Sequence, residues 1–431
     1  MKVSDSGGQP AQLTSPNDPN LSHRWPQFLP DGDHILFLSI KEGGTVDELD
    51  AVSISGGEVR KVADDHGNLS IYHQGRLLWV RGADLLAQNF DASTLKLSGT
   101  QRVLAENLAV DQSRWTSDVT VSATDLLVYR SSANSDRTQL TWLDLETANA
   151  IGSIGEPGPY QNPVVSPDGR KIAVSTSNQQ DESSSIVLMD AGRGVATLFV
   201  PTSEKSGFNG YIWTPDSKNL VFGSNRGSLQ RYSLYIKPVS GEPEQLLLKS
   251  DEDLFPSAVT PDGKYIVFGK YGSGESSDDV WMMPLQGERK PVPLLTTKAK
   301  EYGLEVSPDG RWLAYRSDES ERYEVYLTSF PSCKGKWQVS GNGGNGISFR
   351  HDGREIAYVD DEGKVYALEF DGRGTEPKMG KQRPVMTGIS MTSLAGGSVS
   401  PDWKHLVGAV RIQTGPPRLT LVTHWSEELK K

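Results

Sequence analysis

A short apolar run that follows a turn recurs along the whole chain, and its spacing restricts the fold more than any other feature. The runs are ILF, LLW, LVY, IAV, LVF, IVF, LAY, IAY and LVG, and they recur every 42 to 50 residues. A repeat of roughly 46 residues built from short β-rich segments is typical of a β-propeller, in which each repeat is one four-stranded blade. The third residues of the nine runs are Phe37, Trp79, Tyr129, Val174, Phe222, Phe268, Tyr315, Tyr358 and Gly408.

One repeat can be followed strand by strand in residues 303–331, GLEVSPDGRWLAYRSDESERYEVYLTSFP. The pattern predicts a first strand at LEVS, a second at WLAYRS, a third at YEVYLTSF and a fourth at the following KWQVSG. Between the first two strands, Pro308 presets its φ for a turn and Gly310 takes the positive φ that closes a hairpin. The Pro-Asp-Gly motif therefore predicts a turn, and we expect Asp309 and Arg311 to be turn and surface residues rather than catalytic ones.

Helix signals are nearly absent, because Gly or Pro interrupts most of the windows that could carry a helical apolar period. The sequence therefore predicts an all-β protein, a β-propeller of about eight or nine four-stranded antiparallel blades over residues 1–431. Strand order at the two ends favours one closed ring, in which SGGQPAQLT supplies the outer strand of a last blade whose third strand is RLTLVTHW. The alternative is three blades over residues 1–149 and a six-bladed ring over 150–431, since nine blades exceed the typical range of about four to eight.

Composition argues against several classes of partner. The net charge is -11 and the basic residues are scattered, so the chain offers no basic groove for nucleic acid. The single cysteine, Cys333, excludes an intrachain disulfide and a zinc site built from cysteines. No segment approaches the roughly 20 apolar residues of a membrane span, and the N-terminal residues lack the apolar core of a signal peptide. We expect no membrane contact from this segment, and it contains no targeting signal.

Catalytic motifs are also missing from the sequence. It contains no HExxH, no GxSxG and none of the protein-kinase signatures. Residues 341–346 satisfy GxGxxG, but ISFRHDG follows them rather than a helix, so we expect a loop between blades and not a phosphate site. The acidic residues 360–363 are more simply a hairpin turn than a calcium site, since no EF-hand spacing follows. The sequence therefore predicts a protein that is not an enzyme and that has no cofactor and no metal.

The loops that precede the first strands are the most promising place for a binding surface. First strands line the central channel of a propeller, so these loops gather on the face opposite the Pro-Asp-Gly turns. They are rich in aromatic, amide and charged side chains, which suit recognition of a peptide or a small ligand. Each residue could instead pack between neighbouring blades, and the sequence does not separate the two roles. The candidate binding residues are His23, Arg24, Trp25, Tyr160, Asn162, Phe208, Asn209, Tyr211, Phe255 and Tyr302.

Several blade segments resemble the TolB-like, WD-like propeller repeats found C-terminal to bacterial membrane-anchored serine/threonine protein kinases, especially those of soil acidobacteria. These segments are PDGRKIAV, WTPDSKNLVFGSNRG, SDEDLFPSAVTPDG, SPDGRWLAYRSDESERYEVYLTSFP and THWSEELKK. The resemblance extends from HRWPQFLPDG at 23–32 to the C-terminus, and kinase relatives usually carry further repeats before that segment. It implies a non-catalytic accessory module outside the cytoplasm, which senses a ligand or binds a protein or peptide at the channel mouth.

Two alternative functions remain open. The first is a periplasmic scaffold of the TolB type, which captures a peptide segment at the mouth of the channel. The second is a propeller enzyme, lactonase-like or cyclase-like, with a metal in the central channel. A metal would need carboxylates from several first strands, whereas LEVS, PVVS, YIWT and SAVT offer little besides Glu305.

Overall fold

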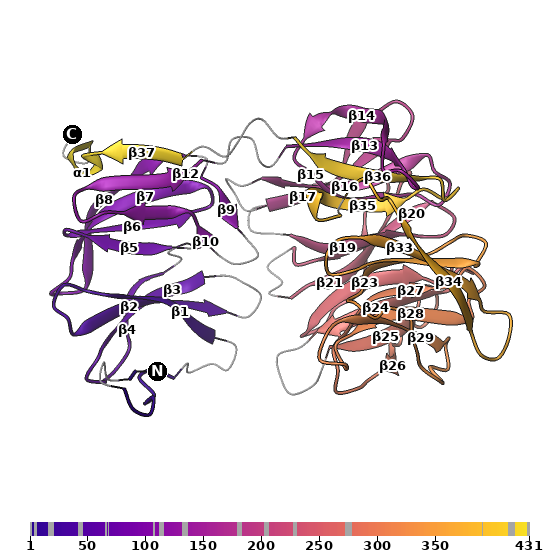
Figure 1. Ribbon diagram of the computed structural model, residues 1–431, viewed down its shortest axis with the longest axis horizontal. Helices are drawn as coiled ribbons and strands as arrows, with labels where there is room; N and C mark the ends of the chain where they lie inside the picture. The colour runs from indigo at the N-terminus through magenta and orange to yellow at the C-terminus, as the bar shows by residue number, and fades with distance from the viewer. Residues whose placement is uncertain are drawn as a thin grey trace. The chain divides into compact units, whose positions relative to one another are not determined.

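The computed structural model describes most of the chain (Figure 1). The described residues are 2–3, 7–15, 21–41, 46–64, 67, 69–106, 108–111, 116–131, 137–178, 183–201, 207–226, 231–271, 278–389, 391–412 and 419–428. They divide into two compact units, the first made of residues 1–135 with 413–431 and the second of residues 136–412. No helix in the described part is long and apolar enough to cross a membrane.

The first unit contains three antiparallel sheets. The first sheet has the order β1 (Leu21–Phe28), β2 (His34–Lys41), β3 (Val46–Ser53), β4 (Arg60–Asp64). The second has the order β5 (Ser70–His73), β6 (Arg76–Arg81), β7 (Asp84–Asp91), β8 (Lys96–Ala105), and the third β11 (Val119–Val121), β12 (Leu126–Arg130), β37 (Leu419–Thr423). A ribbon of β9 (Val110–Asp111) and β10 (Thr116–Ser117) and a short helix, α1 (Trp425–Glu428), accompany them. Apolar clusters join the first sheet to the second and the second to the third.

The second unit contains six four-stranded antiparallel sheets, five of them built from consecutive strands. The first and second sheets are β15 (Tyr160–Val165), β16 (Lys171–Asn178), β17 (Ser183–Asp190), β18 (Ala196–Val200) and β19 (Phe208–Trp213), β20 (Asn219–Ser224), β21 (Ser233–Pro238), β22 (Gln245–Leu248). The third and fourth are β23 (Asp253–Val259), β24 (Tyr265–Tyr271), β25 (Asp279–Pro284), β26 (Val292–Leu295) and β27 (Glu301–Val306), β28 (Trp312–Ser317), β29 (Glu324–Ser329), β30 (Trp337–Gln338). The fifth is β31 (Asn345–Phe349), β32 (Glu355–Val359), β33 (Val365–Asp371), β34 (Lys378–Val385).

The sixth sheet joins strands from the two ends of the second unit. Its order is β14 (Ala150–Gly158), β13 (Thr138–Asp144), β36 (His405–Arg411), β35 (Leu394–Val399), and a 3-10 turn, η1 (Met391–Ser393), precedes β35. Figure 1 shows the yellow strands β35 and β36 beside the magenta strands β13 and β14. Apolar clusters link each sheet of this unit to the next, and they link the sixth sheet both to the fifth and to the first.

The repeat period seen in the sequence corresponds to one sheet per repeat. All nine marker residues, from Phe37 in β2 to Gly408 in β36, lie on the second strand of their sheet, where β35 counts as the first strand of the sixth sheet of the second unit. Among the described residues, eight of these nine sheets have four strands and the remaining one has three. The prediction of an all-β propeller with four-stranded antiparallel blades is therefore confirmed.

Two terminal segments do not lie where strand order alone would place them. Strand β13 pairs with β36 along its whole length, so residues 136–149 belong to the second unit. Strand β37 pairs with β12, so residues 413–431 belong to the first unit, and the boundaries differ from the expected division at residue 149. Within the described residues, the N-terminal segment forms an isolated bridge between Lys2 and Ala11 rather than an outer strand beside β37.

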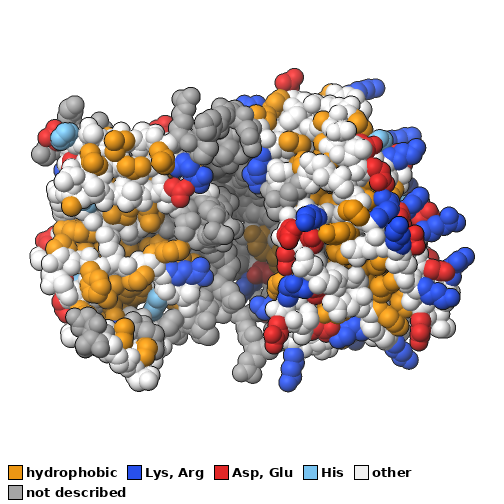
Figure 2. Space-filling view, viewed as in Figure 1, with side chains coloured by type: hydrophobic (Ala, Val, Ile, Leu, Met, Phe, Trp, Pro, Cys, Tyr) orange, Lys and Arg blue, Asp and Glu red, His pale blue; other side chains and the backbone are white. Residues whose placement is uncertain are grey.

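Strand β37 is unusual because alternate side chains on it face solvent. Leu419 is 72% exposed and Leu421 is 59% exposed, whereas the third strands of the four-stranded sheets are largely buried. Figure 2 shows hydrophobic side chains gathered over this part of the first unit. In this three-stranded sheet β37 has β12 as its partner strand, and one of its two faces is open to solvent.

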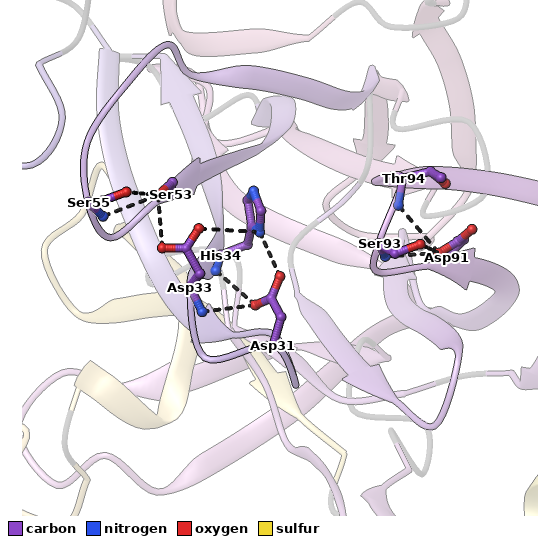
Figure 3. Close-up of polar contacts among 8 residues, drawn as sticks. All are labelled: Asp31, Asp33, His34, Ser53, Ser55, Asp91, Ser93 and Thr94. Carbon is purple, nitrogen blue, oxygen red and sulfur yellow. Dashed lines mark hydrogen bonds and ion pairs between the residues drawn. The ribbon is translucent and has the colours of Figure 1, made fainter.

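The aspartates of the Pro-Asp-Gly motifs hold the turns between first and second strands. Ser307 Oγ donates to Asp309 Oδ1 at 2.5 Å, and the Arg311 N–H donates to the same oxygen at 3.1 Å. In the corresponding turn of the first unit, Asp31 accepts bonds from the Asp33 and His34 N–H groups (Figure 3). Hydrogen bonding from His34 lowers the pKa of Asp31 to about 2. The repeated aspartate is therefore a turn residue, as its sequence context predicts.

Candidate binding site

Every first strand of the second unit contains a β-bulge near its beginning. The register shifts lie at Gln161/Val164, Phe208/Gly210, Pro256/Ala258, Tyr302/Glu305, Asn345/Ser348 and Leu394/Gly397. A bulge bends its strand and changes the direction of the side chains on either side of it. In four of these strands, residues within and after the bulge line a cavity, whereas the residues before the bulges lie at the loop face, opposite the Pro-Asp-Gly turns.

The cavity has a volume of about 500 Å³ and lies along β19, β23, β27 and β31. Its lining consists of Ile212, Trp213, Pro256, Ser257, Ala258, Val259, Gly303, Leu304, Glu305, Val306, Gly346 and Ile347. Neighbouring first strands therefore meet along it, as expected for the central channel of a propeller. Among these lining residues, Glu305 is the one carboxylate, and the Phe349 N–H donates to its Oε1 at 3.1 Å. Burial raises the pKa of Glu305 to about 8.

This raised pKa predicts a pH-dependent stability for the second unit. Above the ordinary glutamate pKa of 4.5 and below about 8, folded Glu305 keeps a proton that the unfolded chain has lost. Stability therefore falls as pH rises through this interval. We expect Glu305→Gln to raise the melting temperature at pH 8 and to leave it unchanged at pH 4. Thermal unfolding followed by circular dichroism at a series of pH values measures this effect.

Two effects make the expected difference in melting temperature smaller than the raised pKa of Glu305 alone would give. The Glu305 side chain is only half-buried, so water at the cavity screens part of its charge. Burial also raises the pKa of Glu301, to about 7, and this residue keeps part of the pH dependence in both proteins. Melting temperatures that differ between parent and variant by the same amount at pH 4 and pH 8 would contradict the assignment to Glu305.

Five half-buried aromatic side chains form a row across the second, third and fourth sheets of the second unit. We call them the aromatic row: Tyr232, Phe255, Tyr271, Tyr302 and Tyr323. Centroids of successive rings lie 6.3, 4.5, 5.0 and 5.8 Å apart. The residues stand at the start of first strands, at the end of a second strand and just before third strands, so the row lies at the loop face. These distances are typical of aromatic side chains in mutual contact.

Polar groups accompany one end of the aromatic row. The Arg316 guanidinium carbon lies 5.2 Å from the Tyr302 ring centroid and 4.2 Å from that of Tyr323. Its Nη1 donates to Asn345 Oδ1, and Tyr302 Oη donates to Asp278 Oδ2. Desolvation and the Asp278 carboxylate raise the pKa of Tyr302 well above its usual range, so this hydroxyl stays protonated. The end of the row thus combines a fixed cation, an amide and a carboxylate.

Two of the ten residues predicted from the sequence, Phe255 and Tyr302, come together in the aromatic row, where Tyr271 connects them. Phe208 lies apart from the row and packs against Phe222, with ring centroids 5.6 Å apart. Tyr160 packs against the apolar cluster between the sixth and first sheets. The latter two residues therefore have packing contacts that suffice to explain their positions.

Three other predicted residues hold neighbouring first strands together. Tyr211 Oη donates to the Asn162 carbonyl oxygen at 2.5 Å, and Tyr211 is 7% exposed. Asn209 Nδ2 donates to the Leu254 carbonyl oxygen at 2.8 Å. Asn162 has a φ of 49° and lies within the bulge of its strand. These contacts join neighbouring blades. Packing between blades was the alternative to ligand binding that the sequence left open for each candidate residue.

The remaining predicted residues belong to β1 of the first unit, and their contacts are local. His23 Nδ1 lies 2.9 Å from Thr14 Oγ1, and Arg24 Nε donates to Ser22 Oγ at 3.1 Å. Trp25 has a φ of 57° and is 42% exposed. The aromatic row belongs to the second unit, so these three residues form no part of it.

Sequence reasoning missed Tyr232, Tyr271, Tyr323 and Arg316 because it considered only the loops before first strands. The end of a second strand and the start of a third reach the same face of a four-stranded meander. An aromatic or basic residue at those places was visible in IVFGKYG and in LAYRSDESERY. Reading both kinds of loop would have found the row.

The match to a family model agrees with the observed architecture. A family model described as the N-terminal β-propeller domain of prolyl oligopeptidase matches residues 160–340. No curated protein matches the chain. Similar solved structures include the putative TolB of Agrobacterium tumefaciens, which is 15% identical with a TM-score of 0.47 over 64% of this chain and 99% of that one.

Two further structures cover more of the chain at lower similarity. TolB of Acinetobacter baumannii is 15% identical with a TM-score of 0.43 over 80% of this chain and 81% of that one. The tricorn protease is 12% identical with a TM-score of 0.43 over 90% of this chain and 44% of that one. The sheet order and the family model thus give the chain a β-propeller fold.

Proposed function

We propose that the second unit binds an extended segment of a partner protein across the aromatic row. The observation that carries the proposal is the row itself, five half-buried rings from three sheets, next to the channel cavity. Tyrosine and phenylalanine supply a large contact area at a low cost in conformational entropy, which is why they dominate recognition surfaces. The polar groups around Arg316 would then fix the direction of the bound segment.

We also propose that the chain is not an enzyme. Among the described residues, no group of three or more His, Cys, Asp or Glu side chains is placed to hold a metal ion. A catalytic metal in the channel would need about three protein ligands, and the described lining offers Glu305 alone. Tyr302 is the tyrosine closest to Glu305 in the sequence. Its hydroxyl donates to Asp278 and stays protonated. These features favour binding over a lactonase-like or cyclase-like reaction.

The resemblance to kinase-associated repeats supports a more specific proposal. In it, the chain is the extracytoplasmic accessory region of a bacterial serine/threonine kinase, and the bound segment is what the region senses. A periplasmic scaffold of the TolB type would use the same surface without a kinase. A kinase domain and a membrane span encoded upstream in the same reading frame would favour the first alternative, and a separate gene for the propeller the second.

Selection from a phage-displayed library of random peptides on the intact protein tests the proposed surface. We expect enrichment of defined sequences, and a tenfold weaker affinity of the corresponding synthetic peptide for Phe255→Ala and for Tyr302→Ala. Tenfold corresponds to about 1.4 kcal/mol, a usual value for loss of one aromatic contact. Ser307→Ala, in a turn on the opposite face, is the matched control and should bind as the parent does. Unchanged affinity in both aromatic variants would contradict the proposal.

A further inference from the structure

A basic residue near the end of the second strand lies against aromatic rings in three consecutive sheets of the second unit. In the second sheet Arg226 lies over Phe222, at 5.3 Å from its centroid, and in the third Lys270 lies over Trp281 at 5.2 Å. In the fourth sheet Arg316 lies over Tyr323 at 4.2 Å. The three cations lie near the same end of the second strand, although they follow the equivalent residues Phe222, Phe268 and Tyr315 at different distances along the chain.

Only two of these three cations have a carboxylate partner among the described residues. Arg226 pairs with Glu244, and Lys270 pairs with Glu252. Arg316 has the neutral Asn345 amide as its hydrogen-bond acceptor, and its buried Nε has no hydrogen-bond partner in the part of the chain that the structure describes. A half-buried guanidinium without a directly bound carboxylate, and with an N–H left unsatisfied, costs free energy that a ligand can recover.

We propose that Arg316 receives a carboxylate of the segment bound across the aromatic row, an inference that rests on the proposed function. A guanidinium presents its N–H groups in a planar fork that matches the two oxygens of a carboxylate. One guanidinium balances one negative charge, and the Asp278 carboxylate on the neighbouring Tyr302 repels a dianion such as phosphate more strongly than a monoanion. The carboxylate can come from an Asp or Glu side chain or from the C-terminus of the partner.

Three synthetic peptides distinguish these sources on the intact protein. The first is acetyl-Gly-Ser-Gly-Phe with a free C-terminal acid, the second its C-terminal amide, and the third acetyl-Gly-Asp-Gly-Phe amide. Titration calorimetry should show at least one acidic peptide binding tenfold more tightly than the neutral amide. Tighter binding of the first peptide alone identifies a C-terminal carboxylate as the ligand. Tighter binding of the third peptide identifies a side-chain carboxylate.

Two variants assign the effect to the unpaired cation. We expect Arg316→Gln to abolish the advantage of the acidic peptide, whereas Arg226→Gln, whose cation is already paired, should keep it. Arg316→Lys should keep part of the advantage, because the charge remains without the fork. Inorganic phosphate should compete no better than acetate at equal ionic strength; stronger competition by phosphate would overturn the choice of a carboxylate.

Stability supplies a second measurement that needs no ligand. Arg316→Gln loses the contacts with the Tyr302 and Tyr323 rings but leaves no carboxylate without a partner, so we expect its melting temperature to stay close to that of the parent. Arg226→Gln leaves Glu244 without its partner and should melt at a lower temperature. A loss of stability in Arg316→Gln as large as that in Arg226→Gln would overturn the inference.

Failure of this inference differs from failure of the proposed function. Equal titration results for all three peptides, or an acidic advantage that persists in Arg316→Gln, overturns the carboxylate site. Library peptides that depend on Phe255 and Tyr302 would still support the aromatic row in that case. Failure of the proposed function would appear instead as unchanged affinity of the library peptides for Phe255→Ala and Tyr302→Ala.

Discussion

Thr141→Pro is expected to unfold the second unit. Thr141 is 7% exposed and lies in β13, where it pairs with Ser153 of β14 and Gly408 of β36. Proline in a central strand removes a ladder donor and does not fit the pleat, at a cost of about 3 kcal/mol or more. The sixth sheet links the first sheet to the fifth, so its loss also exposes the apolar clusters on both sides. Urea unfolding followed by far-ultraviolet circular dichroism measures the effect.

A proline at an edge position of the same unit serves as the control. Val292 is the first residue of the outer strand β26, is 42% exposed and stands between two prolines in the sequence. Val292→Pro should therefore cost less than about 1 kcal/mol. A parent-like unfolding midpoint in Thr141→Pro would contradict the assignment of β13 to the centre of this sheet.

Trp425→Ala is expected to destabilise the first unit by about 3 to 5 kcal/mol, the usual cost of truncating a buried tryptophan. Trp425 is 1% exposed and joins the apolar cluster of the second and third sheets, which includes Leu78 and Leu127. Next to it, Ser426 Oγ donates to Asp125 Oδ2 at 2.7 Å, which fixes the C-terminal helix. The C-terminal residues thus complete a sheet whose other strands lie far away in the sequence.

The matched control is Leu419→Ala in the neighbouring strand β37, where the side chain is 72% exposed. We expect this change to alter stability by less than about 0.5 kcal/mol, as surface substitutions usually do. Urea unfolding followed by tryptophan fluorescence compares the two variants. Equal effects of Trp425→Ala and Leu419→Ala would mean that the C-terminal helix does not dock as described.

Local chemistry made the repeats predictable. Apolar second strands and Pro-Asp-Gly turns are specified by neighbouring residues, so all nine second strands could be placed from the sequence. The pairing of strands distant in sequence could not be placed in the same way. TQLTWLD and RLTLVT both have the pattern of a third strand, and only tertiary packing assigns the first to β36 and the second to β12.

The candidate site was predictable to a similar extent. The sequence indicated the loop face and included Phe255 and Tyr302, because aromatic residues before first strands are visible in the repeat. It could not show that Tyr211 and Asn209 bond to backbone carbonyls of neighbouring strands. Nor could it show that Arg226 has a glutamate partner and Arg316 has none among the described residues, since charge pairing depends on how the folded sheet places its side chains.

Amide hydrogen exchange with and without a selected peptide tests the central claim, binding across the aromatic row, most directly. We expect slower exchange on peptide binding around Phe255, Tyr302 and Arg316, at the loop face of three neighbouring sheets. The turn at residues 307–311, on the opposite face, should exchange at the same rate in both states. Protection confined to that turn, or to the first unit, would contradict a binding surface on the aromatic row.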